Sequence, residues 1–344
     1  MGLSFKDLVV KKETSISDLS GKTVAVDSMN LLYQFLTTIR SRDGSQLTDS
    51  HGQVTSHLIG LFNRTTKLME SGLKLVFVFD GKPPEIKQKT KEKRAAVKKQ
   101  AALKLKEAAA IGDKEGMYKF ASQTTVLTSQ MVDEAKKLVT LLGCPVVLAP
   151  SEGEAQCAYM AKKGEVDYAV SQDYDSLIFG CPNLVRNLSI AGKRKKAGRF
   201  AFQIVKPEIL SLSDNLNHLG LDIDQLIVLA ILVGTDYNPG GVKGIGPKTG
   251  LKLVKEFSDF DGVFEKANWK EHFPDLDWKE IFYTIKNIPT IDDYNLEWGV
   301  VNEKELVKFL IKEHDFSEER VKTKLQKLLK EKEKQKQTGL GSFF

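Results

Sequence analysis

Acidic side chains recur where short apolar segments of this sequence end. Three valine-rich segments each end on an aspartate, at Asp27, Asp80 and Asp173. Four further acids stand near such ends, and they are Glu152, Glu154, Asp175 and Asp236. If the segments are parallel strands, their carboxyl ends share the edge of the sheet where ligands bind in open α/β folds. Carboxylates gathered there repel one another unless cations compensate their charge.

This ligand set favours a hard cation, because Mg²⁺ and Mn²⁺ prefer oxygen donors. The five histidines are scattered without an H-E-x-x-H motif, and the three cysteines lack C-x-x-C spacing, so neither set indicates zinc. No G-x-x-x-x-G-K-[ST] loop occurs, which argues against phosphoryl transfer from a nucleotide. Two divalent ions about 3.5–4 Å apart can hydrolyse a phosphodiester. We therefore predict two Mg²⁺ ions, for which Mn²⁺ can substitute.

Each acid also has a purely local alternative. A single aspartate after a strand is commonly a turn residue or a helix N-cap. Ser151 with Glu154 three residues later could form a capping box, which would give Glu154 a structural role. Seven acids at element ends are much harder to explain as caps, and we favour the metal site.

The elements that must position these acids alternate along the chain. The predicted strands span residues 23–27, 75–80 and 166–173, with a similar run at 144–150. The predicted helices between them span about 54–70, 132–142 and 154–162. This alternation predicts an α/β fold in which a parallel or mixed twisted sheet is flanked by helices. Later helices are predicted at 222–233, 250–257 and 317–336, and the last eight residues are expected to stand apart from them.

The stretch from Lys82 to Lys106 is strongly basic, with ten Lys or Arg residues against two acids. Its composition favours a helix, but it has no clear apolar face, so we expect poor packing and mobility without a partner. An ordinary solvated lysine-rich helix is the alternative. The start of the stretch, two residues after Asp80, favours nucleic-acid binding.

The 344 residues are 41% apolar, which suffices for a core in one large domain or two ordinary ones. No apolar run approaches the roughly 20 residues of a membrane span, and the first residues do not form a secretory signal. We therefore expect an intracellular protein without a membrane partner. The net charge of +6 is by itself weak evidence for nucleic acid.

Five sequence pieces occur in a specific order, and they are AVDSMNLLYQF, VFVFDGKPPEIK, APSEGEAQCAYMA, SQDYDSLIFG and LVGTDYNPGGVKGIGPKTG. Together they resemble the flap endonucleases of the XPG-type structure-specific 5′ nuclease family, over residues 1–344. The lack of a basic extension after the tail motif looks like archaeal members, which implies a place in the cytoplasm or nucleoid. The resemblance implies a PIN-like nuclease core with a helical arch and a helix-hairpin-helix type DNA-binding element. It also implies a 5′ flap endonuclease with 5′→3′ exonuclease activity in DNA replication and repair.

The resemblance assigns roles to the acids and to two arch residues. A first metal group matches Asp27, Asp80, Glu152 and Glu154, and a second matches Asp173, Asp175 and Asp236. Lys87 and Arg94 match basic residues of the arch that act on the scissile phosphate.

DNA contacts are implied at four further positions. Tyr33 matches an aromatic residue that stacks on a base near the cut, and Gly2 matches a residue whose backbone lies near the active site. Arg40 and Arg64 match contacts near the DNA junction. Two departures weaken that last match, since we expect an aromatic residue at Asn63 and a basic one at Gln53.

The glycine-rich loop at 240–250 predicts phosphate binding, because glycines let backbone amides approach closely and the next helix adds its positive end. A simple Gly/Pro turn is the alternative. Here the resemblance implies a hairpin that binds duplex DNA through K⁺, with Gly244 and Gly246 as the closest matches.

The C-terminus carries the motif Q-x-x-L-x-x-F-F, formed by Gln337, Leu340, Phe343 and Phe344. Two exposed aromatic residues on a tail indicate a partner with a pocket for them. The motif resembles the clamp-binding box of replication proteins, which implies a sliding clamp (PCNA) as partner. Such a short turn should form only on that partner. The resemblance also implies a monomer that acts on branched DNA with a 5′ flap.

The predicted division follows these motifs. It comprises an N-terminal nuclease part (1–100, with the arch from about 82), the rest of the arch (101–130), an internal nuclease part (131–260, with the hairpin at about 224–257), a C-terminal helical part (261–330) and the clamp-binding tail (331–344). The alternatives are a sibling 5′→3′ exonuclease or junction resolvase, a PIN-like ribonuclease, and a non-catalytic clamp-bound DNA-structure binder.

Overall fold

The chain folds into two units, each assembled from stretches that lie far apart in the sequence. The first unit comprises residues 1–15, 78–92 and 148–292, and the second comprises residues 16–77, 93–147 and 293–344. The computed structural model describes residues 5–41, 44–195 and 202–341.

The sheet of the first unit is mixed. Its strands, in spatial order, are β1 (Lys12–Glu13), β9 (Glu208–Ser211), β6 (Asn183–Arg186) and β5 (Tyr168–Val170). β5 and β6 are parallel, with Val170 opposite Val185, whereas β9 is antiparallel to both β6 and β1. A separate antiparallel ribbon joins β7 (Gly192–Lys195) to β8 (Phe202–Val205). The mixed sheet flanked by helices confirms the predicted fold class.

The helices of the first unit pack around α9, whose apolar sequence is buried from Leu226 to Leu232. α9 (Ile223–Val233) begins at a capping box formed by Asp222 and Gln225 and ends before Gly234. It contacts α7 (Asp175–Ile178), α10 (Pro247–Glu256) and α13 (Trp278–Lys286). The remaining helices are η2 (Glu85–Lys87), α6 (Gly153–Lys162), η3 (Leu188–Ile190), α8 (Leu212–Leu219), α11 (Phe260–Lys266) and α12 (Trp269–His272).

The strands β2 (Thr23–Asp27), β3 (Lys74–Phe79) and β4 (Val146–Leu148) lie in that order in the sheet. β2 belongs to the second unit, while β3 and β4 each run from the second unit into the first. β3 is buried from Leu75 to Phe79, which is why its sequence is continuously apolar.

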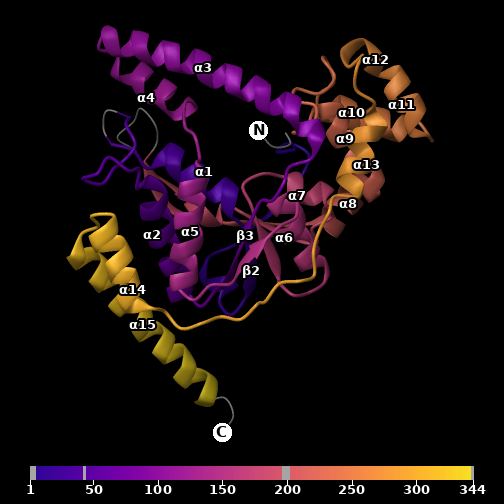
Figure 1. Ribbon diagram of the computed structural model, residues 1–344. Helices are drawn as coiled ribbons and strands as arrows, with labels where there is room; N and C mark the ends of the chain where they lie inside the picture. Colours follow the sequence, from indigo (N-terminus) through magenta and orange to yellow (C-terminus); the bar gives the residue numbers. More distant parts are fainter. Residues whose placement is uncertain (1–4, 42–43, 196–201, 342–344) are drawn as a thin grey trace. The chain divides into compact units, whose positions relative to one another are not determined.

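Helices of the second unit gather on α2 (Ser56–Glu70), which contacts α1 (Ser28–Thr38), α5 (Ser129–Leu141) and α15 (Glu318–Gly341). Figure 1 shows α2 and α5 side by side. The other helices are η1 (Ser17–Leu19), α4 (Lys114–Gln123), α14 (Glu303–Val307) and a π-helical turn (Lys308–Glu313). α3 (Gln88–Ala110) begins at the end of a first-unit stretch and continues in the second unit, and it confirms that the basic stretch is helical.

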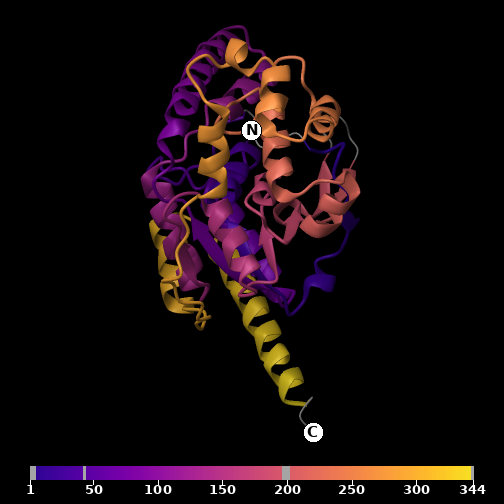
Figure 2. The ribbon, with the colours of Figure 1, turned by 90° about the vertical axis from the view of Figure 1, so that its right-hand side faces the viewer.

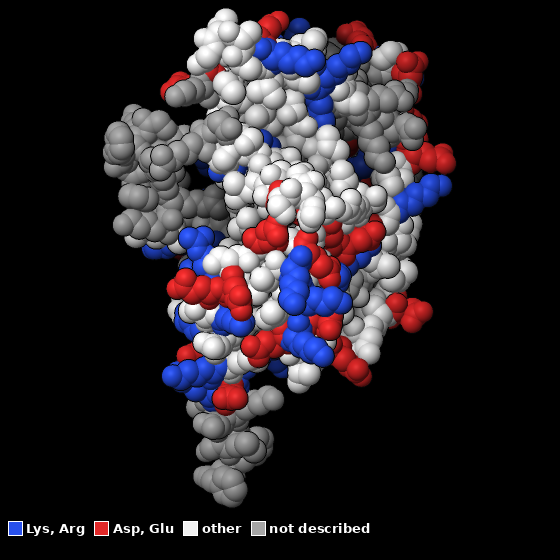
Figure 3. Space-filling view, turned by 60° about the vertical axis from the view of Figure 1, so that its left-hand side comes forward, with Lys and Arg blue, Asp and Glu red and all other residues white. Residues whose placement is uncertain are grey.

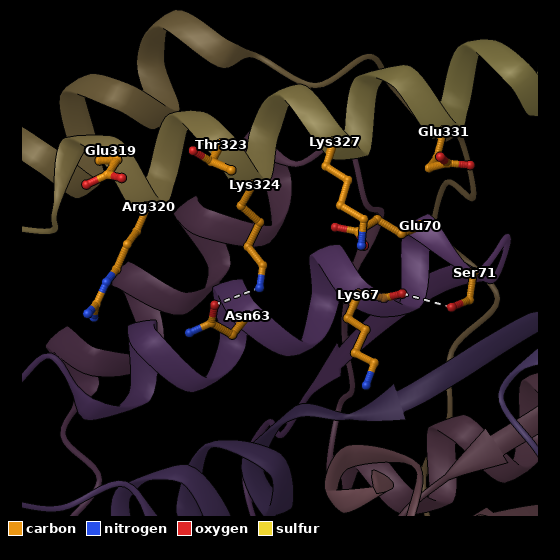
Figure 4. Close-up of a pocket in the computed structure, with 10 residues that line it drawn as sticks. All are labelled: Asn63, Lys67, Glu70, Ser71, Glu319, Arg320, Thr323, Lys324, Lys327 and Glu331. Carbon is orange, nitrogen blue, oxygen red and sulfur yellow. Dashed lines mark hydrogen bonds and ion pairs between the residues drawn. The ribbon is translucent and has the colours of Figure 1, made fainter. Parts of the chain in front are cut away.

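A groove separates α2 from α15, and polar side chains bridge it (Figure 4). Lys327 Nζ lies 2.8 Å from Glu70 Oε2, and Lys324 Nζ donates to Asn63 Oδ1 at 2.8 Å. Gln335 Nε2 donates to the Glu70 carbonyl at 3.3 Å. Asn63, where the family resemblance suggests an aromatic residue, is therefore used to attach α15.

α15 corrects the prediction for the tail. Its backbone is helical through Gly341, so Gln337 and Leu340 continue the charged helix and do not stand apart from it (Figure 2). The run of Lys, Glu and Gln residues before Gly339 consists of good helix formers without a helix breaker, which explains the continuation. α10 likewise begins three residues before its predicted start, because Pro247 occupies its first position.

Among the described residues, no single helix combines the length and the apolar composition needed to cross a membrane. α8 and α9 reach those values only as a pair, across a bend of 77°.

Candidate active site

Asp80 follows β3 directly and is held against the start of α6. Its Oδ1 accepts a hydrogen bond from the Gly153 amide at 2.8 Å. A Cβ atom at Gly153 would lie 2.8 Å from the same oxygen, so glycine is needed for this approach. The Gly81 amide donates to the Ser151 carbonyl at 2.7 Å. These contacts bring the end of one predicted strand to the loop that carries Glu152 and Glu154.

Lys87 joins two of the predicted metal ligands. Its Nζ lies 2.8 Å from Glu152 Oε1 and 3.4 Å from Asp236 Oδ2. The Tyr237 hydroxyl donates to the same Glu152 oxygen at 2.6 Å, and the Lys87 ammonium lies 5.2 Å from the centre of the Tyr237 ring. Thr90 Oγ1 donates to the Asp236 carbonyl at 2.9 Å. The beginning of the basic stretch is thus attached to the acids.

The pKa values of Asp80, Lys87 and Tyr237 are all raised in this cluster. Desolvation raises the pKa of Asp80, and the charges of Glu152 and Asp236 raise it further, against the Gly153 hydrogen bond and the Lys87 charge. Burial acts to lower the pKa of Lys87, but Glu152 and Asp236 together hold it above its ordinary value. Burial, followed by the Glu152 charge, raises the pKa of Tyr237. Lys87 is therefore charged and Tyr237 is a neutral donor at physiological pH.

The second predicted metal group begins just after β5. Ser171 Oγ donates to Glu154 Oε1 in a short hydrogen bond, and the Asp173 amide donates to Ser171 Oγ at 3.2 Å. Asp175 is the first residue of α7 and is buried. Ser171 therefore links Glu154, from the first predicted metal group, to the loop that carries the second.

The capping-box alternative for Glu154 is wrong. The N-cap of α6 is Glu152, and no side chain caps this helix. Because α6 begins at Gly153, Ser151 lies one position too early to act as the cap.

Asp27 lies in the second unit, at the end of β2, and is the N-cap of α1. Its Oδ1 accepts from the Asn30 amide at 3.2 Å. The capping role proposed as the local alternative is therefore confirmed for this residue, while its role as a metal ligand stays a prediction.

The donor set suits a hard divalent cation. Asp80, Glu152, Glu154, Asp175 and Asp236 supply carboxylate oxygens, which are the donors that Mg²⁺ and Mn²⁺ prefer. Within the described residues, no three acidic, His or Cys side chains already converge closely enough to hold an ion.

Tyr33 and Arg40 contact segments near the predicted arch within the second unit. The Tyr33 hydroxyl donates to the Thr125 carbonyl at 3.2 Å, and Lys98 of α3 donates to that hydroxyl at 2.5 Å. Arg40 donates to the Gly44 carbonyl at 2.8 Å and, in a short hydrogen bond, to Thr125 Oγ1. Lys98 and Thr125 are partners that sequence reasoning did not identify.

Other predicted DNA contacts are placed only in part. Arg64 is half-buried on α2. Arg94 lies in α3, but its side chain falls outside the described residues, as do Gly2, Phe343, Phe344 and the side chains of Gln337 and Leu340.

The glycine-rich loop forms a helix–loop–helix between α9 and α10. Gly240, Gly241 and Gly244 have φ values of 92°, 59° and 88°, a region that favours glycine. Gly246 is the N-cap of α10, and a Cβ atom there would meet nothing within 4 Å. Its backbone amide end is therefore open to a phosphate, although phosphate binding stays a prediction.

Charge on the surface does not form one field on the face drawn in Figure 3. There, Lys and Arg side chains are interspersed with Asp and Glu side chains. The net charge of +6 therefore says less about a ligand than the local arrangement of the acids around Lys87.

The chain is similar to known nucleases. A model of the XPG N-terminal domain matches residues 3–101, and a model of the XPG I-region matches residues 143–236. Flap endonuclease 1 of Pyrococcus abyssi is 50% identical over 344 residues, which cover 100% of this chain and 98% of that protein.

Two solved structures are similar as well. Flap endonuclease-1 from Methanococcus jannaschii is 42% identical, with a TM-score of 0.75 and coverage of 96% of this chain and 98% of that one. The catalytic core of Rad2 in complex with a DNA substrate is 25% identical, with a TM-score of 0.70 and coverage of 95% and 100%. The similarity thus extends past residue 236 into the helices beyond the two matched family regions.

Carboxylate repulsion predicts the effect of Asp80→Asn on stability in a chelating buffer. The amide keeps an acceptor for Gly153 but removes a charge that Glu152 and Asp236 oppose. We expect the variant to unfold at a higher urea concentration than the wild type in EDTA, and to gain less from added Mg²⁺. Asp261→Asn, at an exposed ion pair with Lys279 in the same unit, is the control. Equal or lower stability of Asp80→Asn in EDTA would contradict the repulsion.

Proposed function

Because this chain belongs to the flap endonuclease family of XPG-type nucleases, we propose that it hydrolyses DNA at the base of 5′ flaps. Cleavage about one nucleotide inside the junction leaves a 5′-phosphate and a 3′-hydroxyl. A 5′→3′ exonuclease activity on nicked duplexes accompanies it. These activities serve the removal of primers and flaps in DNA replication and repair.

The observation that carries the proposal is the meeting of Glu152 and Asp236 at the Lys87 ammonium, beside Asp80. This lysine faces two acids and is followed by a long basic helix. Acids and a cation at one point fit a phosphodiester that must be bound and attacked.

Divalent metal ions are required across this family, and we propose that two Mg²⁺ ions act here. Asp80, Glu152 and Glu154, with Asp27 of the second unit, would hold the first, and Asp173, Asp175 and Asp236 the second. Mn²⁺ would substitute, because the donors are all oxygens. Bound ions supply an activated water and stabilise the charge that develops on the phosphate and on the leaving oxygen.

The chain's own residues have distinct tasks around that site. Tyr237 holds Glu152 through its hydroxyl, and Ser171 holds Glu154, so both carboxylates keep fixed orientations. Lys87 and Arg94 place positive charge at the start of the arch, where a scissile phosphate would accept their hydrogen bonds. Tyr33, half-exposed beside Lys98, offers a ring face to the base next to the cut.

DNA on either side of the junction needs further contacts. We assign Arg40 and Arg64 to the junction, Gly2 to the backbone near the active site, and α3 with α4 to an arch around the 5′ flap. The hairpin loop at Gly244 and Gly246 would bind duplex DNA, with a K⁺ ion between the loop and a phosphate. We place the boundaries between the parts of the chain at about residues 100, 130, 260 and 330, so that each part has one of these roles.

The protein partner that we propose is a sliding clamp. Gln337, Leu340, Phe343 and Phe344 form a motif that fits the pocket of a sliding clamp (PCNA). The helical backbone of α15 up to Gly341 supports presentation of Gln337 and Leu340 on one helical side. The nuclease itself acts as a monomer.

A panel of substrates tests the proposed function. A double-flap, a nicked duplex and a four-way junction, each digested with and without Mg²⁺, separate the alternatives. We expect fastest cleavage of the double flap, near its junction, and none without metal. Preference for the four-way junction would favour a resolvase, processive digestion of the nick an exonuclease, and binding without cleavage a DNA-structure binder.

Loss of one ligand from the second metal group should abolish catalysis and spare binding. For Asp173→Ala we expect the cleavage rate to fall by a factor on the order of 10³ or more, because the metal site lowers the activation barrier by several kcal/mol. Single-turnover cleavage and flap binding in Ca²⁺ measure the two effects. Asp261→Ala is the control, and full-rate cleavage by Asp173→Ala in Mg²⁺ would disprove the assignment.

Lys87→Ala and Arg94→Ala should lower the single-turnover rate far more than the affinity for flap DNA. Each cation acts on charge that develops in the transition state, so about 10²–10³-fold in rate is expected. Lys136→Ala on α5, which removes an exposed cation paired with Asp133, is the control. If the arch variants lose only affinity, the two residues are ordinary backbone contacts.

Deletion of residues 337–344 should leave basal flap cleavage intact and remove stimulation by the clamp. Two buried Phe side chains could contribute roughly 1.5–3 kcal/mol each to clamp binding before ordering costs. Cleavage by full-length and shortened chains, with and without clamp, measures both effects. Full stimulation of the shortened chain would show that the motif is dispensable.

A further inference from the structure

The loop that carries Asp173 and Asp175 rests on an arginine that the proposed mechanism does not use. Arg186 is the last residue of β6, next to β5, and the loop begins directly after β5. Its Nε donates to the Gln172 carbonyl at 2.9 Å, one residue before Asp173. Its Nη1 donates to the Tyr174 hydroxyl in a short hydrogen bond.

The same guanidinium also lies over the ring of Tyr174, with Cζ 3.8 Å from the ring centre. Tyr174 is buried and lies between Asp173 and Asp175, so its ring fixes the chain between the two acids. Arginine can serve these contacts at once, because its guanidinium carries several N–H donors in a fixed fork and its positive charge is attracted to an aromatic ring.

Arg186 is itself held from the opposite side. It lies directly opposite Glu208 in the β6–β9 register, and Nη1 is 3.8 Å from Glu208 Oε2. Lys11 Nζ lies 2.7 Å from the other Glu208 oxygen. A row of alternating charges thus runs from Lys11 through Glu208 to Arg186 and ends at the loop.

Asp173 and Asp175 carry like charges two residues apart and repel each other, and Ser171, two residues before Asp173, binds the further acid Glu154. Without a support, the loop would relax outward and the acids would have to be reassembled at each metal-binding event. Contacts behind metal ligands commonly change metal affinity by about 10–100-fold. Arg186 supports the loop through a carbonyl and a ring.

We infer that Arg186 is a positioning residue that pre-organises Asp173 and Asp175 for divalent cation binding, through Gln172 and Tyr174. The inference rests on the proposed metal site and adds a residue that acts behind it. It predicts that loss of Arg186 weakens metal binding much more than it weakens the fold or DNA binding.

Calorimetric titration of Mn²⁺ into the full chain, without DNA, tests this directly. Arg186→Ala should bind Mn²⁺ about 10–100-fold more weakly than the wild type. Arg186→Lys should recover only part of the loss, because a lysine ammonium lacks the fixed fork with which arginine donates to both Gln172 and Tyr174. Tyr174→Phe keeps the ring and removes the hydroxyl, so its loss should be smaller than that of Arg186→Ala. This variant and the lysine variant keep the test open if the alanine variant does not fold.

Lys286→Ala is the matched control, since it breaks a 2.6 Å ion pair with Asp224 in the same unit. Mg²⁺ dependence of the single-turnover rate gives the second readout: the Arg186→Ala rate should fall at low Mg²⁺ and recover at high Mg²⁺. Wild-type Mn²⁺ affinity in Arg186→Ala, or a loss equal to that in Lys286→Ala, would overturn the inference. A further outcome separates the two proposals. If the wild type binds Mn²⁺ but cuts no flap, and Arg186→Ala binds Mn²⁺ more weakly, the inference is supported and only the proposed function is refuted.

Discussion

Repulsion between carboxylates is the constraint on which the active site depends. Burial raises the pKa of Asp80, and the charges of Glu152 and Asp236 raise it further, while the Lys87 ammonium lies between the last two acids. Such a cluster costs stability unless cations join it. The metal ions proposed here and the Lys87 ammonium would both bring positive charge to these carboxylates, and that charge would also attract a DNA phosphate.

The fold restrains the acids by contacts that lie behind them. Gly153 lets α6 approach Asp80, Tyr237 orients Glu152, and Ser171 ties Glu154 to the loop after β5. The buried helix α9 ends just before Asp236 and so sets its position. Regular elements thus position the side chains, while most of the described side chains of α3 from Ala95 onward are exposed.

Sequence patterns predicted the parts of this arrangement that are local. β2 has its predicted bounds, and Asp80 follows β3 as expected, because buried strands carry continuous apolar runs. Strands β6 and β9 and the partners Tyr237, Lys98 and Ser171 were missed, since their roles depend on residues far away in the chain. The capping box at Ser151 failed because the backbone starts α6 one residue later, and the tail was misjudged because α15 continues through Gly339 instead of ending before it.

Anomalous diffraction from crystals soaked in Mn²⁺ tests the central claim most directly, that these acids form a cation site. We expect anomalous peaks contacted by the carboxylates of Glu152, Glu154, Asp173 and Asp175, and loss of the peak beside the mutated residue in Asp173→Ala. The absence of an anomalous peak at these carboxylates in crystals saturated with Mn²⁺ would contradict the account.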